Sequence, residues 1–153
     1  MALRMLQPND LSRFLAPSSC FEILDSFDDL AGKRVLILGP DIGIMCELIR
    51  RGCREVTELD KHGCLKTGTV DLVIVSSIGT GSEAAYAIDR ARRALTLAGH
   101  LVVRTTADPS EWLSRAIKRT LRLHGFSAII AHQALGCAVF TAELNLLRSL
   151  VRA

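Results

Sequence analysis

Residues Lys33 to Asp60, KRVLILGPDIGIMCELIRRGCREVTELD, decide the fold. The stretch begins with a continuous apolar run, residues 35–38, which is typical of a strand that is buried on both faces of a sheet. A glycine turn, a helical pattern and a second strand follow, and the second strand ends at Asp60. This order predicts an α/β fold with a doubly wound, mostly parallel sheet and helices on both faces.

The same stretch also predicts a class of ligand. In open α/β sheets, ligands bind outside the carboxyl ends of the strands. There, the backbone amides of the turn from Gly39 to Gly43 and the N-terminus of the next helix can bind anions. An acid about 20 residues further along accepts ribose hydroxyls in such folds, and Asp60 lies where that acid is expected. We therefore predict a ligand that contains a ribose.

The composition is that of one domain. The chain has 153 residues, enough to bury a core without disulfides or metal. Hydrophobic residues make up 49% of it, but the longest apolar runs are far shorter than the ~20 residues of a bilayer span. The first residues, MALRMLQPND, lack the apolar segment of a signal peptide. We predict a cytoplasmic protein with a single domain over residues 1–153, in which 1–20 form an N-terminal extension and 144–153 a C-terminal helix.

The cysteines predict neither a disulfide framework nor a metal site. Their number is odd and none forms a CxxC pair, which favours reduced thiols. His62 and Cys64 could share a metal, but no partner pair lies at zinc-site spacing. The cysteines are Cys20, Cys46, Cys53, Cys64 and Cys137.

Periodicity and turn residues place the other elements. We expect Asp108 to cap a helix that starts at Pro109, and Met45, Leu48 and Ile49 to face the sheet from the helix after the glycine turn. The predicted strands are Arg34–Leu38, Glu55–Leu59, Val70–Ser76, Leu101–Arg104 and an antiparallel pair, Phe126–His132 and Cys137–Glu143. The predicted helices are Asp10–Leu15, Phe21–Leu30, Ile44–Arg51, Glu83–Leu97, Pro109–His124 and Leu144–Val151.

With these strands placed, the chain resembles the class I S-adenosylmethionine-dependent methyltransferases, whose mostly parallel sheet ends in an antiparallel hairpin. The family's first motif, an apolar run into G-x-G-x-G, is matched by VLILGPDIG, and its ribose-binding acid by Asp60 in VTELD. Its fourth motif is matched by VDLVIVSS. Its helix ending R-x-L-x-P-G-G is matched by Arg93 to Gly99, and Gly125-Phe126 fits a pattern before the hairpin. The resemblance implies S-adenosylmethionine as cofactor, and the candidate binding residues are Gly39, Asp41, Gly43, Asp60 and Ser76.

Two single residues depart from the family. Many members carry an acid two residues before the first motif glycine, where it helps to hold the cofactor's amino-acid end, and Ile37 occupies that position here. Asp41 replaces a glycine or asparagine and places a carboxylate where the cofactor's carboxylate should lie. Asp41 either binds the cofactor's ammonium group or caps the following helix.

The segment 61–70 is too short for the helix and third strand that the family usually inserts there. Part of the adenine pocket is then absent, and the sheet has one strand fewer than in the family. The exposed flank of the second strand becomes an edge to which another subunit can pair, which predicts a homodimer.

The motifs name no catalytic residue. The family's amino-group methylases carry N/D-P-P-Y/F after the fourth motif strand, and Ser76-Ser77-Ile78-Gly79 stands there instead. Ser76 and Ser77 either face the ligand or bond to the loop backbone. Methyl transfer can rest on positioning alone, so the absence of a general base does not exclude catalysis.

Three functions follow from this sequence. The first is a small methyltransferase that acts on a small molecule, and the second is a methyltransferase-like subunit that has lost catalysis and binds a ligand or partner. The third is nucleic-acid binding through the helix over 109–124, although a charged outer face is common on surface helices and the net charge is only +3. The basic residues of that helix are Arg115, Lys118, Arg119 and Arg122.

Overall fold

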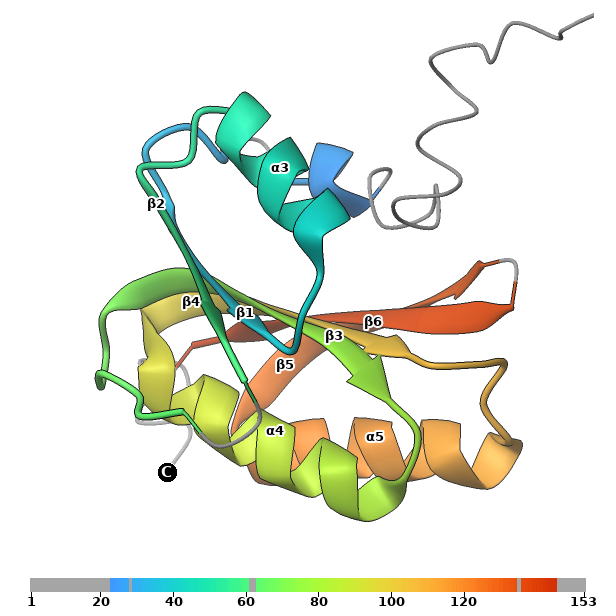
Figure 1. Ribbon diagram of the computed structural model, residues 1–153. Helices are drawn as coiled ribbons and strands as arrows, with labels where there is room; N and C mark the ends of the chain where they lie inside the picture. Colours follow the sequence, from blue (N-terminus) through green and yellow to red (C-terminus); the bar gives the residue numbers. More distant parts are fainter. Residues whose placement is uncertain (1–22, 28, 61–62, 135, 146–153) are drawn as a thin grey trace, which may run out of the picture.

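The computed structural model describes residues 23–27, 29–60, 63–134 and 136–145, which form one mixed sheet with helices on both faces (Figure 1). The strands are β1 (Arg34–Leu38), β2 (Glu55–Leu59), β3 (Val70–Ile78), β4 (Leu95–Thr105), β5 (Phe126–Ala134) and β6 (Cys137–Leu144). The helices are α3 (Ile42–Arg50), α4 (Gly81–Ala94) and α5 (Glu111–Leu123).

The strand order, β2-β1-β3-β4-β6-β5, confirms the predicted fold class. The four strands β2, β1, β3 and β4 are parallel, whereas β6 runs antiparallel to both β4 and β5. Within the described part of the chain, β2 lies at an edge, and residues 63–69 add neither helix nor strand between β2 and β3. The predicted shortening of the sheet is thereby confirmed.

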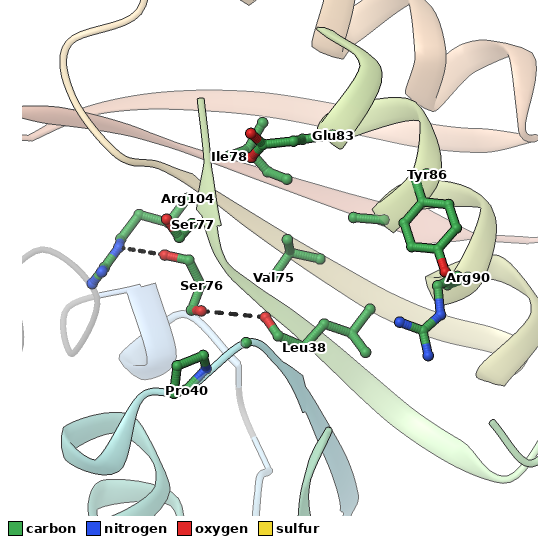
Figure 2. Close-up of a pocket in the computed structure, with 12 residues that line it drawn as sticks. Leu38, Pro40, Val75, Ser76, Ser77, Ile78, Glu83, Tyr86, Arg90 and Arg104 are labelled. Carbon is green, nitrogen blue, oxygen red and sulfur yellow. Dashed lines mark hydrogen bonds between the residues drawn. The ribbon is translucent and has the colours of Figure 1, made fainter. Parts of the chain in front are cut away.

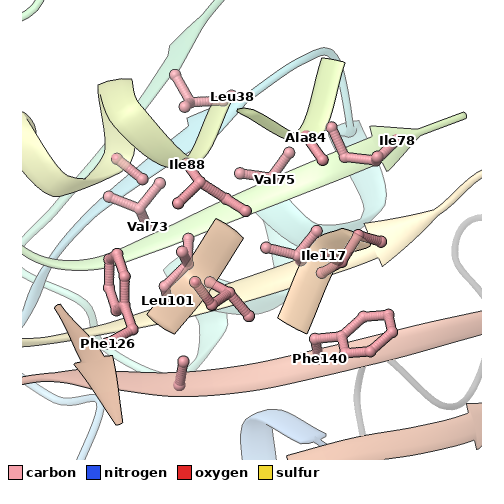
Figure 3. Packing of buried hydrophobic residues seen from close by; sticks show 14 of the residues in the cluster. Leu38, Val73, Val75, Ile78, Ala84, Ile88, Leu101, Ile117, Phe126 and Phe140 are labelled. Atoms are coloured by element: carbon pink, nitrogen blue, oxygen red, sulfur yellow. The ribbon is translucent and has the colours of Figure 1, made fainter. Parts of the chain in front are cut away.

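The helices pack on the sheet through apolar stripes that differ in size. On one face, α3 contributes Ile44 and Leu48, which are fully buried against β1 and β3. On the other face, α4 and α5 lie side by side below the sheet (Figure 1). Alanines on α4 allow the helix to approach β3 closely, and larger side chains from α5 complete this core (Figure 3). The buried residues of α4 and α5 include Ala84, Ile88, Ala91, Ala94, Leu113, Ile117 and Leu121.

The structure corrects several predicted boundaries. The predicted helix Glu83–Leu97 is α4, which begins at Gly81 and ends at Ala94, and β4 already starts at Leu95. The register of β4 against β3 shifts between Leu95 and His100. Gly99 therefore lies within β4. A Cβ on Gly99 would lie 2.6 Å from Leu95 Cδ2 and 3.3 Å from the Asp71 carbonyl oxygen, so glycine is required for close packing rather than for a turn.

Side-chain placement differs from the prediction at two helices. Ile49 is 61% exposed, because the buried stripe of α3 follows Ile44 and Leu48, four residues apart. The cap of α5 is Ser110, which accepts a hydrogen bond from the Leu113 amide, and not Asp108. Both Asp and Ser are favoured caps, and burial of Leu113 selects the later start.

The termini are only partly described. Of the predicted helix Phe21–Leu30, residues 23–25 are helical, and Leu30 is a buried residue outside that helix. Leu144 ends β6 instead of starting a helix, because it is buried and pairs with Phe126. The predicted helix Asp10–Leu15 and the rest of the predicted C-terminal helix lie outside the described residues.

Candidate functional site

The carboxyl ends of β1, β2 and β3 meet at one edge of the sheet. Parallel pairing places Leu38 opposite both Leu59 and Val75, and the Gly39 amide donates a hydrogen bond to the Leu59 carbonyl at 2.9 Å. The glycine turn and Asp60 therefore leave the sheet at the same edge, as the sequence predicts. This is the edge at which open α/β sheets bind ligands.

Gly39 is required at its position for two reasons. Its φ of +98° is unfavourable for residues with a side chain. A Cβ there would also lie 2.5 Å from Ser76 Oγ. The buried Ser76 hydroxyl donates to the Leu38 carbonyl at 3.2 Å, so it bonds to the backbone of β1 and not to a loop. The turn and β3 are thus fitted to each other without space for a side chain on Gly39.

Asp41 caps α3, which was one of its two predicted roles. Its Oδ1 accepts a hydrogen bond from the Ile44 amide at 3.1 Å. Its Oδ2 lies 3.6 Å from Arg104 Nη1, and the carboxylate is only 7% exposed. Gly43 is buried in the first turn of α3. Asp41 and Gly43 therefore fix the conformation of the turn where it enters α3.

A cavity of about 340 Å³ opens beside the turn, between the ends of β1 and β3 and one side of α4 (Figure 2). Of the predicted site residues, Gly39 and Ser76 line it, and Asp41, Gly43 and Asp60 lie outside its lining. Its volume is in the range of small-molecule sites. The lining residues are Leu38, Gly39, Pro40, Val75, Ser76, Ser77, Ile78, Glu83, Tyr86, Ala87, Arg90 and Arg104.

Arg90 connects this cavity to the loop after β2. Its side chain donates hydrogen bonds to the carbonyl oxygens of Asp60, at 3.3 Å, and Gly63. Its guanidinium carbon lies 5.5 Å from the centre of the Tyr86 ring, and the residue is only 7% exposed. Arg90 therefore fixes the loop that carries Asp60. The sequence analysis missed it, although an arginine between Ala87 and Ala91 on a buried helix face could have indicated it.

Arg104 is the second residue that the sequence analysis missed. It lies near the carboxyl end of β4, and its Nε donates to the Ser76 carbonyl at 2.9 Å. Arg90 and Arg104 approach the cavity from different sides (Figure 2). The available signal was a charged residue directly after the buried run Leu101 to Val103, at the ligand-binding edge.

A second cavity, of about 410 Å³, lies between the loops after β3 and β4. Ile78 lines both cavities. Trp112, at the start of α5, lines the second one and is 69% exposed, although its ring packs close to Gly81. Both cavities therefore border on the end of β3.

The described residues contain no group of three or more His, Cys, Asp or Glu side chains that could hold a metal ion. The residues His62 and Cys64 cannot be compared as a pair, because His62 lies outside the described part. Burial raises the pKa of the Cys53 thiol above its ordinary value. A hydrogen bond from Arg50 holds the pKa of the Glu47 carboxyl below its ordinary value. The Arg50 side chain itself is exposed. Both shifts belong to residues that do not line the cavity beside the turn.

The basic face of α5 is partly neutralised within the helix. Arg115 forms an ion pair with Glu111, four residues earlier, and both side chains are exposed. Leu113, Ile117 and Leu121 form the buried face. Among the described residues, no helix is long and apolar enough to span a bilayer.

Comparisons of sequence find no match with a protein-family model or a curated protein. Comparisons of structure find many similar folds. The Thermus thermophilus 16S rRNA N2 G1207 methyltransferase, in complex with AdoMet and guanosine, has a TM-score of 0.59 and 19% identity over 81% of this chain. The match covers 38% of that enzyme, so this chain corresponds to less than half of it.

Two smaller proteins match over nearly their whole length. A SAM-dependent methyltransferase from Aquifex aeolicus has a TM-score of 0.63 and 12% identity, over 92% of this chain and 100% of its own. An S-adenosylmethionine-dependent methyltransferase from Mesorhizobium loti has a TM-score of 0.64 and 13% identity, over 84% and 98%. At these identities the likeness concerns the fold. The chain has the Rossmann-like fold of class I S-adenosylmethionine-dependent methyltransferases, shortened between β2 and β3.

Proposed function

We propose that this chain binds S-adenosylmethionine and transfers its methyl group to a small molecule. One observation carries the proposal: the Gly39 turn, a cavity of about 340 Å³ and the loop of Asp60 lie at one edge of the sheet. The fold of solved methyltransferases supports it. The bound cofactor supplies an electrophilic methyl group on a sulfonium.

The residues present fit the nucleoside part of this cofactor. Gly39 lines the cavity, so a ligand there meets the backbone of the turn and no side chain at this position. Asp60 can accept hydrogen bonds from ribose hydroxyls. Arg90 holds the Asp60 loop by two backbone carbonyls, and therefore keeps that loop at the edge of the sheet where the turn lies.

The second cavity supports a small acceptor. Its volume of about 410 Å³ suits a small molecule, and Ile78 lines it as well as the first cavity. Trp112 offers an exposed aromatic surface for a planar group. The chain's part in transfer would be to hold acceptor and cofactor in line, since positioning alone can lower the barrier by several kcal/mol.

A second candidate function is ligand binding without methyl transfer. Ile37, fully buried where many family members carry an acid, and the shortened segment before β3 favour it. Formation of a methylated product distinguishes the two functions. A cytoplasmic location stays a prediction from the sequence.

Calorimetric titration with S-adenosylhomocysteine tests the cofactor proposal. We expect binding by the unaltered protein, and dissociation constants about 10- to 100-fold higher for Asp60→Ala, because the ribose loses charge-assisted hydrogen bonds. Glu55→Ala, at the exposed opposite end of the same strand, is the matched control and should bind normally. Absence of binding by the unaltered protein at millimolar ligand, or equal affinities in Asp60→Ala and the control, would contradict the proposal.

The edge position of β2 supports a homodimer in which two copies pair along this strand. β2 pairs with β1 on one side, and within the described residues nothing pairs with its other side. Unpaired backbone groups on a sheet edge are a template for a second strand. We expect size-exclusion chromatography with light scattering to give a dimer at tens of micromolar protein. A monomer mass throughout that range would refute the dimer and leave the cofactor proposal intact.

A further inference from the structure

Helix α3 carries an apolar stripe that points away from the core. Ile42 is 71% exposed and Ile49 is 61% exposed, and Met45 and the exposed Cys46 lie between them. These four residues, the α3 stripe, stand at positions i, i+3, i+4 and i+7 and therefore share one side of the helix. The same spacing is used by helices that bind another chain through an apolar face.

The α3 stripe lies on the side of the helix that faces the edge of the sheet at β2. Leu48 is fully buried towards the sheet. Arg51 lies on one side of this direction and pairs at 2.7 Å with Asp25, in the segment before β1 whose Phe27 packs against β4. Because successive residues are about 100° apart, Ile49 lies on the other side. Figure 1 accordingly shows the segment before β1 and β2 on opposite sides of α3.

Strand β2 turns backbone groups towards the same edge. The Leu59 carbonyl accepts from the Gly39 amide and so points to β1. Since these groups alternate along a strand, those of Thr57 also point to β1, and those of Val56 and Glu58 point outwards. Two antiparallel β2 strands centred on Thr57 would pair each Val56 with Glu58 of the partner subunit, without like charges opposite each other. A shift by two residues places Glu58 opposite itself or leaves Leu59 beyond the paired strand.

The strand and the helix can meet a second copy at the same two-fold axis. Helix α3 packs on side chains of both β1 and β2, among them Ile37 and Val56. A helix midway above these strands would lie two strand spacings, or about 10 Å, from its copy across the paired edge. Packed helices are about 8–10 Å apart, so the two α3 stripes would contact each other. Strands of five residues are short for a stable dimer, and the stripe adds apolar area to the contact.

We propose that a second copy of this chain docks on the β2 edge through two layers, a strand pair centred on Thr57 and a helix pair formed by the α3 stripes. This inference rests on the homodimer proposed above and names the side chains that hold it together. The α3 stripe contributes no residue to the lining of the cavity beside the Gly39 turn. The interface and the ligand site can therefore be altered separately.

Ile49→Glu tests the helix layer. The side chain is exposed and glutamate is a good helix former, so the fold should persist. Light scattering over a dilution series should show a dimer for the unaltered protein. For Ile49→Glu we expect a dimer dissociation constant at least about tenfold higher, because two carboxylates enter an apolar contact. S-adenosylhomocysteine should bind this variant with unchanged affinity.

Ile130→Glu is the matched control, since Ile130 is 54% exposed on β5, at the other edge of the sheet. It should keep the dimer. A dimer that resists Ile49→Glu, or that dissociates in Ile130→Glu instead, would overturn the helix layer. A monomer for the unaltered protein would overturn the homodimer and this interface together, and binding of S-adenosylhomocysteine would still support the cofactor proposal.

Thr57→Cys tests the strand layer. In the proposed register the two Thr57 residues form a pair without hydrogen bonds, with Cα atoms about 4.5 Å apart, which suits a disulfide. Mild oxidation should therefore link two copies, and mass spectrometry should locate the bond at position 57 and not at the native cysteines. Glu55→Cys is the control, because its counterpart lies four residues further along the partner's strand. A dimer in which Thr57→Cys stays unlinked, or Glu55→Cys links equally well, would overturn the register.

Discussion

We expect Gly39→Ala to lower the free energy of unfolding by roughly 2 to 5 kcal/mol and to weaken binding of S-adenosylhomocysteine, because it distorts the turn that lines the cavity. The backbone at Gly39 has a φ of +98°, which costs a residue with a side chain about 1 to 2 kcal/mol. The new methyl group would lie 2.5 Å from Ser76 Oγ, and such overpacking costs typically about 1 to 3 kcal/mol. Urea denaturation measures the first effect and calorimetry the second.

Gly136 offers a matched control for the backbone part of this effect. Its φ is +78°, and a Cβ there would have no neighbour within 4 Å. Gly136→Ala should therefore cost only about 1 to 2 kcal/mol and leave ligand binding unchanged. In Gly39→Ala/Ser76→Ala the contact with the hydroxyl is gone, so the double variant should lose less than the sum of the two single changes. Equal stabilities of Gly39→Ala and Gly136→Ala would show that the turn is not fitted to Ser76.

The second large effect is expected at Arg90. Arg90→Met keeps an apolar side chain in the helix but removes the donor to the carbonyls of Asp60 and Gly63. Hydrogen bonds to charged groups contribute about 1.5 to 3 kcal/mol each, so we expect a loss of roughly 2 to 4 kcal/mol in the free energy of unfolding. Affinity for S-adenosylhomocysteine should also fall about tenfold or more, because the Asp60 loop is no longer held.

Hydrogen exchange distinguishes this role from general destabilisation. In Arg90→Met, amide exchange should accelerate most in residues 63–69, under conditions in which the core of β3 stays protected. Arg92→Met, two residues further along α4 and with an exposed side chain, should change neither exchange nor affinity. A uniform acceleration across all elements, or an unchanged loop, would refute the role of Arg90 in holding the Asp60 loop.

The framework was predictable from local patterns. β1 and β2 have the predicted bounds. For β1, an apolar run between Gly32 and Gly39 determines where the buried strand starts and ends. The hairpin of β5 and β6 was predictable for a similar reason, with a turn at Gly136. The same patterns placed the glycine turn and Asp60 at one edge, since parallel strands share their carboxyl ends.

What the sequence could not predict depends on contacts between distant residues. Arg90 bonds to carbonyls about 30 positions earlier in the chain, and Arg104 lies against Asp41 from a different strand. The local periodicity of a sequence does not predict contacts between side chains that are so far apart along the chain. The end of α4 was mispredicted because Leu95 and Leu97 continue the apolar pattern, while the sheet pairs Leu95 with Val70. Pairing with β3, and not the helical pattern of the sequence, therefore determines that Leu95 belongs to a strand.

A crystal structure of the protein grown with S-adenosylhomocysteine tests the central claim most directly. The account predicts density for the nucleoside at the carboxyl edge, with the ribose hydroxyls on Asp60 and the ligand in the cavity beside Gly39. A ligand bound elsewhere on the molecule, or side chains closing the space between Gly39 and Asp60 at saturating ligand, would contradict it.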